Sequence, residues 1–464
     1  MSGLFGILHV ARSAIIAQQT AVRVASQNIS NAETDGYTRT RAEMVTAPSI
    51  MTPYGQLGSG VRIDNVSRLR DPLLDANFRR DSGRAASSDL RFQLLDQVQQ
   101  VLGEPSEIGL SRALDAFHSA WTDLSAQPTS TPLRGLVVQR GEQLATMLNS
   151  FSDRLDETKT YARQRLELGV SDINRLAEQI AMVSGQIVQA ETSGQMATDL
   201  RDHRDLLVDE LSTLGSVRVL DRSPNDFSVL IDGAMVADGA DHDPLTIAGP
   251  PTELRIGSRT LRFEQASTMG DLLDVINTQI PTVQARLDTL AAGIVEQVNA
   301  LHSSGYTVGG ATGVNFFDPA GTTARTIAVS VASSNVVTSD VAGETSNNRV
   351  ALAMGALRAK PSENTVASSF AAWTAVQNNL GGVSFAEHYA VTVVDLGTVV
   401  NGAENDASVY STLAQQAESR RESLSGVSTD EELILVMQNQ QAYSAAARLV
   451  TVVDEMMQTI LQLT

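Results

Sequence analysis

Apolar residues near the N-terminus recur in steps of four and three, a spacing typical of an amphipathic helix. Gln18 is the one polar interruption of this row. The row consists of Leu4, Leu8, Ala11, Ile15, Val22, Ala25 and Ile29. Thr34-Asp35-Gly36 supplies a turn and a permissive glycine, so we expect the helix to end near Asn31.

The C-terminal stretch predicts a second long helix that carries two apolar rows. Ser428-Thr-Asp-Glu431 is a capping box with three acidic residues in the first turn. One row contains Leu433, Val436, Gln440, Tyr443, Ala447, Val450, Met457 and Leu461, and the other contains Leu449, Val453, Met456, Ile460 and Leu463. A helix with such stripes needs partners to be stable in water. Pattern alone leaves two arrangements open: both ends fold back on their own bundle, or they pair and pack on other subunits.

Proline placement divides the middle of the chain. Two long proline-free stretches, Leu133 to Ser223 and Ser362 to the C-terminus, are rich in good helix formers. Thr131-Pro132 is expected to start the first helix, and Pro281 to start another. Between the helices, Gly215 to Gly270 contains short strand-like runs separated by turn residues. A second irregular stretch, Gly305 to Glu344, is a candidate for further strands.

These patterns predict an α+β fold with paired N- and C-terminal coiled-coil helices, a long-helix bundle domain and a small β-rich inserted domain. We expect residues 1–80 with 427–464 to form the terminal domain. Residues 81–215, 268–304 and 345–426 would form the bundle. The β-rich domain would be 216–267, to which 305–344 is a candidate addition.

Composition narrows the classes of function. The 464 residues carry 34 basic and 53 acidic side chains, a net charge of −19, which argues against nucleic acid and anionic lipid as main partners. Cysteine is absent, which excludes disulfides, thiolate metal sites and cysteine nucleophiles. The start of the chain lacks a basic region and a cleavage site, so we expect no cleaved signal peptide. No apolar run approaches the roughly 20 residues that span a bilayer, so we expect no membrane insertion.

The sequence contains no convincing motif for catalysis, metal binding or phosphate binding. The six histidines have no metal-ligand spacing. Asp202-His203-Arg204-Asp205 is expected to form a solvated or ion-paired helix face, and Asp241-His242-Asp243-Pro244 a loop. Gly55-Gln-Leu-Gly58-Ser-Gly60 lacks the lysine of a phosphate loop and suits a turn. We therefore predict no catalytic residue, no cofactor and no metal, and a protein that is not an enzyme.

Both ends of the chain resemble a known family. Ala25-Ser-Gln-Asn-Ile-Ser-Asn-Ala32 and Gly36-Tyr-Thr-Arg39 are similar to the N-terminal signature of bacterial flagellar rod, hook and hook-associated proteins. Gln440-Gln-Ala-Tyr443 and the following Ala445-Ala-Ala-Arg448 are similar to the C-terminal signature. Internal segments, including Asp199 to Leu211, Asn315-Phe-Phe317 and Ser425-Gly-Val-Ser428, resemble the hook-associated members that join hook to filament.

The resemblance implies a structural role and a set of partners. In this family the terminal helices pair as the innermost layer of a tube and are largely disordered in free monomers. The implied partners are the chain itself in a ring, the hook protein, a second junction protein or flagellin, and an export chaperone. The implied location is the extracellular flagellum, reached through the flagellar type III export channel. One alternative is a hook or distal rod subunit, which the long central helical stretch disfavours. Another is a secreted enzyme on a flagellar scaffold, which the histidine-poor β segment disfavours.

We expect the assembly interface to use residues of the terminal rows and of the first turn. These are Leu4, Leu8, Ile15, Val22, Asn28, Ile29, Asn31, Gly36, Tyr37, Leu433, Val436, Tyr443, Val450, Val453, Met457, Ile460 and Leu461.

Overall fold

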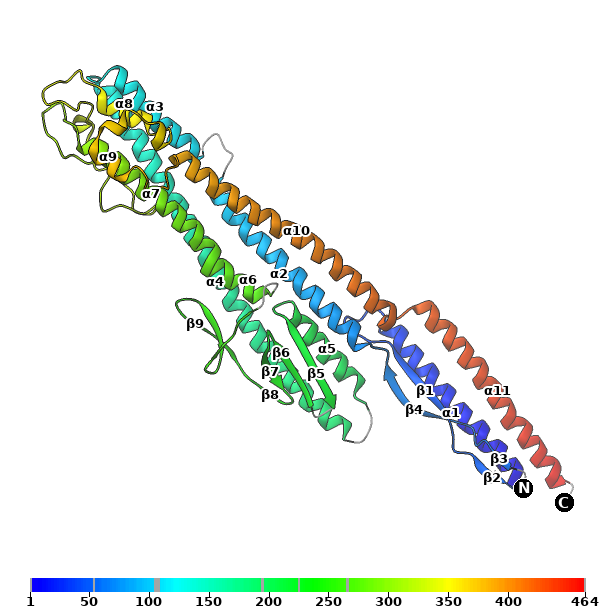
Figure 1. Ribbon diagram of the computed structural model, residues 1–464. Coiled ribbons are helices and arrows are strands. Elements are labelled where there is room, and N and C mark those ends of the chain that lie inside the picture. The colour runs from blue at the N-terminus through cyan, green and yellow to red at the C-terminus, as the bar shows by residue number, and fades with distance from the viewer. Residues whose placement is uncertain are drawn as a thin grey trace.

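The chain forms a long rod with both termini at the same end (Figure 1). The computed structural model describes residues 2–52, 55–103, 109–192, 196–223, 226–263 and 267–462. Its α-helices are Ser2–Ser30 (α1), Pro72–Leu102 (α2), Leu110–Ala126 (α3), Thr131–Glu191 (α4), Thr198–Ser212 (α5), Thr268–Asp274 (α6), Ile280–Ser303 (α7), Arg349–Ala356 (α8), Ala371–Val376 (α9), Phe385–Ser425 (α10) and Thr429–Gln462 (α11). Short 3-10 turns are Ser333–Asn335 (η2), Pro361–Glu363 (η3) and Ala367–Ser369 (η4).

The strands belong to small antiparallel sheets. They are Thr40–Thr46 (β1), Ile50–Thr52 (β2), Gly55–Leu57 (β3), Val61–Arg68 (β4), Val217–Ser223 (β5), Asp226–Ile231 (β6), Ala234–Asp238 (β7), Asp241–His242 (β8), Leu245–Ala248 (β9), Glu253–Ile256 (β10) and Arg259–Thr260 (β11). The combination of long terminal helices and a small β insert confirms the predicted α+β class.

At one end of the rod, α1 and α11 run antiparallel and a β-ribbon covers α1 (Figure 1). In the ribbon, β1 pairs with β4, and β2 pairs with β3 nearer the tip. Gly60 sits against α1 with φ of +105°; a Cβ there would lie 2.1 Å from the Ser13 hydroxyl oxygen. Residues 1–80 were expected in the terminal domain, but their sequence pattern did not predict this ribbon.

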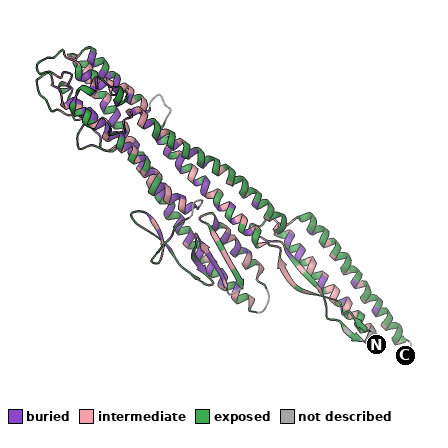
Figure 2. Cartoon of the chain, viewed as in Figure 1, coloured by how far each residue is buried: buried purple, intermediate pink, exposed green. Residues whose placement is uncertain are grey.

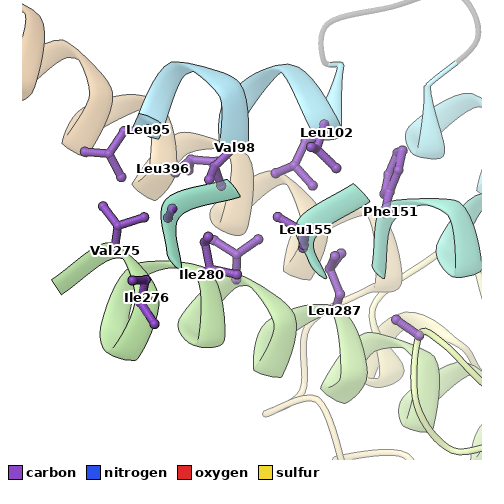
Figure 3. Packing of buried hydrophobic residues seen from close by; sticks show 14 of the residues in the cluster. Leu95, Val98, Leu102, Phe151, Leu155, Val275, Ile276, Ile280, Leu287 and Leu396 are labelled. Atoms are coloured by element: carbon purple, nitrogen blue, oxygen red, sulfur yellow. The ribbon is translucent and has the colours of Figure 1, made fainter. Parts of the chain in front are cut away.

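The centre of the rod is the pair α2 and α10, which pack along most of their length. Asp71 caps α2 by accepting from the backbone N–H of Leu73, with Pro72 in the first turn, and Gly103 ends the helix with φ of +59°. The core here joins leucine and valine side chains of α2 and α10 to those of α4 and α7 (Figure 3). The helix α2 runs unbroken through residue 80, so the domain boundary expected there falls inside it.

The 61-residue helix α4 runs from the far end of the rod, where it packs on α3, past the centre to the β insert beside α5 (Figure 1). Its cap is Ser130, whose side chain accepts from Leu133 N, one residue earlier than expected. Pro281 lies in the first turn of α7, as expected, but no loop precedes that helix: α6 continues into α7 through a π-turn at Val275–Gln279. Proline has no N–H to donate to the preceding turn, and a π-turn accommodates such a gap in the hydrogen-bond ladder.

The predicted β insertion forms two small sheets beside α4 and α5 (Figure 1). One has the order β5-β6-β7-β8, and the other has β11-β10-β9. Asp241 and His242, expected in a loop, pair with Asp238 and Ala237 as the short edge strand β8.

The candidate strands at 305–344 do not form, and this expectation is corrected. In the described residues this segment makes only isolated bridges, such as Phe317 with Val329, and it lies on the helices at the far end (Figure 1). The physical reason is that side chains of α7 make hydrogen bonds with the backbone of residues 305–344 that a neighbouring strand would otherwise make. The Asn299 Oδ1 accepts from the N–H groups of Phe316 and Phe317, each at 2.9 Å, and the His302 Nε2 accepts from Val337 N–H at 3.0 Å.

Candidate assembly surface

Asn28 is the centre of a buried hydrogen-bond cluster that ties both chain ends together. Its Nδ2 donates to the Thr40 carbonyl at 2.9 Å and to the Glu432 carboxylate at 3.1 Å. Its Oδ1 accepts from the Tyr37 hydroxyl at 2.8 Å and from the Thr40 N–H at 3.0 Å. One fully satisfied amide therefore joins α1, the first turn, β1 and α11, and this brings together the expected residues Asn28 and Tyr37.

Arg39 and Glu432 complete this cluster and were not among the expected site residues. The Arg39 Nε donates to Glu432 at 2.7 Å, and its Nη1 to Glu431 at 3.0 Å. The Arg39 N–H donates to the Ser425 carbonyl at the end of α10. Ser428 caps α11 through the Glu431 N–H, as the capping box predicts, but the Glu431 side chain pairs with Arg39. The feature of the sequence that could have identified Arg39 is its position directly after Gly36-Tyr37-Thr38.

Gly36 sits where the first turn meets α5. Its φ is +75°, and an added Cβ would lie 3.2 Å from the Cβ of Leu206. Asn31 has a local role, because its Nδ2 donates to the Gln27 carbonyl and the residue ends α1. The structure thus places Gly36 at a contact between elements and Asn31 at an ordinary helix end.

Replacing Gly36 with alanine is expected to destabilise the chain by about 1–2 kcal/mol, since L-residues are strained at this backbone conformation. Urea denaturation followed by circular dichroism measures this loss. Gly58→Ala is the matched control, because a Cβ at Gly58 meets nothing within 4 Å and its φ is not left-handed. Equal stability of the two variants would contradict the account of the turn.

The α1 row lies on the face that the ribbon leaves uncovered. On the ribbon side of α1, Ser13 accepts from the Val61 N–H at the start of β4, and Val10 lies against Gly60. The predicted row lies on another side of the helix. Ala11 and Ala25 in this row are buried, and Leu4, Leu8, Ile15, Val22 and Ile29 are half-buried. Because α11 is the other element packed along α1, we infer that this row faces α11.

On α11 the inner row differs in part from the expected one. The residues that lie inward are Glu432, Val436, Asn439, Tyr443, Ala446, Val450, Val453 and Met457, in alternating steps of four and three. Val436, Tyr443, Val450 and Met457 were expected there, and the expected Ala447 is also half-buried. Leu433 is 50% exposed and Ile460 is 44% exposed, so neither joins the row. The side chain of Leu461 lies outside the described part of the chain.

Apolar side chains on the outward faces of α11 remain exposed after it has paired with α1, and we refer to them together as the outer row. Its exposed members are Leu433, Ile434, Leu435, Met437, Leu449, Val452, Met456 and Ile460. On α1, Phe5, Ile7 and Ile16 are about half exposed. Figure 2 shows α11 exposed along most of its length, as α10 also is, whereas α4 and α7 are largely buried. Apolar patches of this extent mark interaction surfaces.

A network of arginines and aspartates connects the terminal end to the body. Arg68 pairs with Asp202 at 2.8 Å and with Asp205 at 2.7 Å, and Arg70 pairs with Asp205 at 2.8 Å. Arg79 bonds Asp205 at 3.4 Å. Arg79 of α2 and Arg421 of α10 both reach Asp209 at 2.6 Å. The network therefore links the ribbon, α5, α2 and α10.

Asp205 is the centre of this network. Burial raises the pKa of its carboxyl, but Arg70, Arg68 and Arg79 outweigh burial and hold the pKa below its usual value. Because the pKa of Asp205 is lower in the folded chain than in the unfolded chain, its ion pairs contribute their full stabilisation above the unfolded pKa of about 4. This stabilisation is lost as the pH falls through the lower pKa of the folded chain. The predicted ion-paired face of Asp202-His203-Arg204-Asp205 is thus confirmed as ion-paired, but Asp202, Arg204 and Asp205 are buried and not solvated.

In the described residues there is no group of three or more histidine, aspartate or glutamate side chains that could hold a metal. No helix in the described part of the chain is long and apolar enough to cross a membrane. His302 is buried, and its ring nitrogens face backbone groups of Val314 and Val337.

Family models match three parts of the chain. The model described as "Flagellar hook-associated protein FlgK helical domain" matches residues 95–317. "Flagella basal body rod protein" matches residues 8–38, and "Flagellar basal body rod FlgEFG protein C-terminal" matches 420–463. "Flagellar hook-associated protein 1" of Bacillus subtilis (strain 168) is 28% identical over 506 residues, which cover 99% of this chain and 98% of the relative. The chain is similar to flagellar hook-associated protein 1 along its whole length and matches the helical domain of that family.

Other relatives in the hook-associated protein 1 family match over a shorter range. The protein of Salmonella typhimurium is 25% identical over 67% of this chain and 59% of its own length. A solved structure, of the flagellar hook junction protein FlgK from Burkholderia pseudomallei, has a TM-score of 0.48 and 22% sequence identity. That similarity covers 52% of this chain and 46% of the solved chain. The two terminal models cover α1 with the first turn and α11, where the Asn28 cluster and the outer row lie.

Proposed function

We propose that this chain is the structural adaptor between the hook and the filament of the bacterial flagellum, and that it self-assembles through α1 and α11. Its similarity to flagellar hook-associated protein 1 supports a structural role in the flagellum. The observation that carries the assembly role is the outer row of α11. A helix pair that has already buried one face and still exposes Leu433, Leu449 and Met456 needs further neighbours.

The mechanism follows from how the ends are joined to the body. Burial of the outer row between copies drives ring formation, since each apolar side chain removed from water contributes about 1.5–3 kcal/mol when fully buried. The Asn28 cluster and the Asp205 network hold the helix pair at a fixed angle to the α2–α10 body. We propose that the body then absorbs the mismatch between the two tubes that the ring joins.

The proposed partners are further copies of this chain, the hook protein on one side, and a second junction protein or flagellin on the other. The proposal includes export to the extracellular flagellum through the flagellar type III apparatus, assisted by an export chaperone. It assigns no catalytic step to any residue of the chain.

Removing α11 is expected to abolish function while the body stays folded. A strain that lacks the gene should carry hooks without filaments and shed flagellin into the medium, and the full chain should restore filaments. A chain ended at Gly426 should not restore them, because it keeps the α2–α10 pair but has lost the outer row. Electron microscopy of the cells and circular dichroism of the purified truncated chain test this. Filaments on cells that carry only the truncated chain would refute the assembly role.

A further inference from the structure

One side of α1 stays open after the helix has packed on α11 and on the ribbon. Its exposed residues recur in steps of four and three, the spacing by which one long helix packs on another. We call these residues the α1 stripe: Phe5, His9, Arg12, Ile16, Gln19 and Arg23. Arg12 and Arg23 make no ion pair with a described residue, and α1 contains no acidic residue. The α1 stripe is therefore an apolar and basic surface that no described element covers.

A row with the same spacing is exposed on α11. We call it the α11 stripe: Leu435, Gln438, Ala442, Ala445, Leu449, Val452 and Met456. None of these side chains is charged, although α11 as a whole carries five acidic residues and one arginine. Continued by one step toward the start of the helix, the row reaches Glu431, which pairs with Arg39 in the Asn28 cluster. The α11 stripe therefore lies on the same side of the helix pair as Asn28.

The α1 stripe lies on the other side of the helix pair. The row of α1 that faces α11 includes Ala11 and Ile29. Arg12 of the α1 stripe follows Ala11 by one position, whereas Asn28 precedes Ile29 by one position. Residues directly after and directly before the facing row flank it on opposite sides, because each residue turns the helix by about 100°. Each copy of the chain therefore presents a different stripe on each side of its helix pair.

Charge selects which stripes meet when two copies come together. Two facing α1 stripes would oppose arginines, and two facing α11 helices would oppose carboxylates; like charges opposed across an interface are unfavourable. An α1 stripe on the α11 stripe of another copy opposes unlike charges, since the exposed acids Glu431 and Glu455 flank the α11 stripe near its two ends. Because the stripes lie on opposite sides, this contact repeats from copy to copy and builds a ring, whereas a contact between identical faces ends at a dimer.

We propose that the α1 stripe of one copy packs on the α11 stripe of the next copy. This inference rests on the proposed assembly through α1 and α11, and it adds which faces of the two helices meet. Each α1 then contacts α11 twice: its own α11 through the facing rows, and the α11 of a neighbour through the stripes. Helices α1 and α11 therefore alternate around the wall of the ring.

The absence of cysteine allows this contact to be tested by cross-linking in assembled flagella. A strain that lacks the gene expresses the full chain with Gln19→Cys in the α1 stripe. Separate variants add one cysteine in the α11 stripe, at Gln438, Ala445 or Val452. These three positions are spaced by roughly 10 Å along the helix, so together they cover a range of axial offsets between copies. With a short bismaleimide, we expect at least one double variant to give a ladder of dimers, trimers and larger products.

Gln19→Cys with Ser444→Cys is the matched control, because Ser444 is exposed on the opposite side of α11 from the stripe. This control and each single variant should give at least tenfold less product larger than a monomer. Dimers from Gln19→Cys alone or from Ala445→Cys alone would mean that identical faces meet, and would overturn the proposal. A link from the α11 stripe to a different protein in place of the ladder would overturn it as well.

Absence of multimers from all double variants on cells that carry filaments would also overturn the proposal. Failure of the natural chain to restore filaments in the deletion strain would instead refute the proposed function, and this is scored before any cysteine is introduced.

Reversing the charge of the α1 stripe tests its electrostatic part. Arg12→Glu with Arg23→Glu is expected to reduce the fraction of cells with filaments at least tenfold, because the stripe would then meet the acidic α11 of the neighbour. Arg12→Lys with Arg23→Lys keeps the charge and should restore filaments as the natural chain does. Both variants should melt like the natural chain by circular dichroism, since both arginines are exposed. Natural numbers of filaments with both charges reversed would contradict the proposed contact.

Discussion

Replacement of Asp205 with asparagine is expected to destabilise the chain by about 3–5 kcal/mol, the range for removing one partner of a buried charged network. The carboxylate lies within 3.4 Å of Arg68, Arg70 and Arg79, and the site is buried. Asparagine fills the same space but leaves the three guanidiniums without their shared counter-charge. Urea unfolding followed by circular dichroism measures the loss.

The control for this variant is Asp153→Asn, which removes a carboxylate from an exposed pair with Arg325. Exposed pairs contribute about 1 kcal/mol or less, so the control should remain near the natural stability. Because Asp205 joins the ribbon to α5 and α2, hydrogen exchange in the Asp205 variant should rise first in residues 40–70. A loss below 1 kcal/mol would mean that the network does not hold the terminal end to the body.

Acid is expected to weaken the far end of the rod at pH values where carboxylates are still charged. Burial lowers the pKa of both His118 and His302 to about 4. A folded pKa below the unfolded value of about 6.5 means that the stabilisation is complete above pH 6.5 and is lost as pH falls toward 4. The loss is about 3 kcal/mol for each imidazole over the whole range, and about 1.4 kcal/mol each by pH 5.5.

Tryptophan emission measures this effect selectively, because Trp121 and Trp373 are both buried at the same end as the two histidines. Urea midpoints should fall between pH 7.5 and 5.5, which keeps the chain above its pI of about 4.7. His302→Gln is the control: its amide can donate to Val314 and accept from Val337 without titrating, so it should remove about half of the pH dependence. A midpoint independent of pH in the natural chain would show that these imidazoles are not neutral and buried.

The sequence was most informative where one residue type determines local geometry. Proline-free stretches predicted α4 and α10, and the turn at Gly36 predicted the end of α1. Alternating steps of three and four predicted α1 as a helix. On α11 they could not select the inner row, because two apolar rows lie side by side on that helix. The choice is made by Glu432, a charged residue whose contact with Asn28 and Arg39 rotates Leu433 outward.

The ribbon β1–β4 and the irregular stretch 305–344 were not predicted correctly, because the spacing of apolar residues does not show how backbone hydrogen bonds are made. The ribbon β1–β4 was missed since its strands are polar on both faces, although Val61-Arg-Ile-Asp64 does alternate. The stretch 305–344 looked like strands from its composition, but Asn299 and His302 take the hydrogen bonds that a neighbouring strand would have made. The Asp205 network joins residues more than 120 positions apart, and no local pattern brings such residues together.

The central claim is that α1 and α11 pair and then bury the outer row of α11 against neighbouring copies at the junction of hook and filament. A helical reconstruction of that junction tests it most directly. We predict a ring of this chain whose α1–α11 pairs lie at the inner wall, with Leu433, Leu449 and Met456 buried between copies. A ring in which these side chains face solvent, or in which the α2–α10 body lines the channel, would contradict the account.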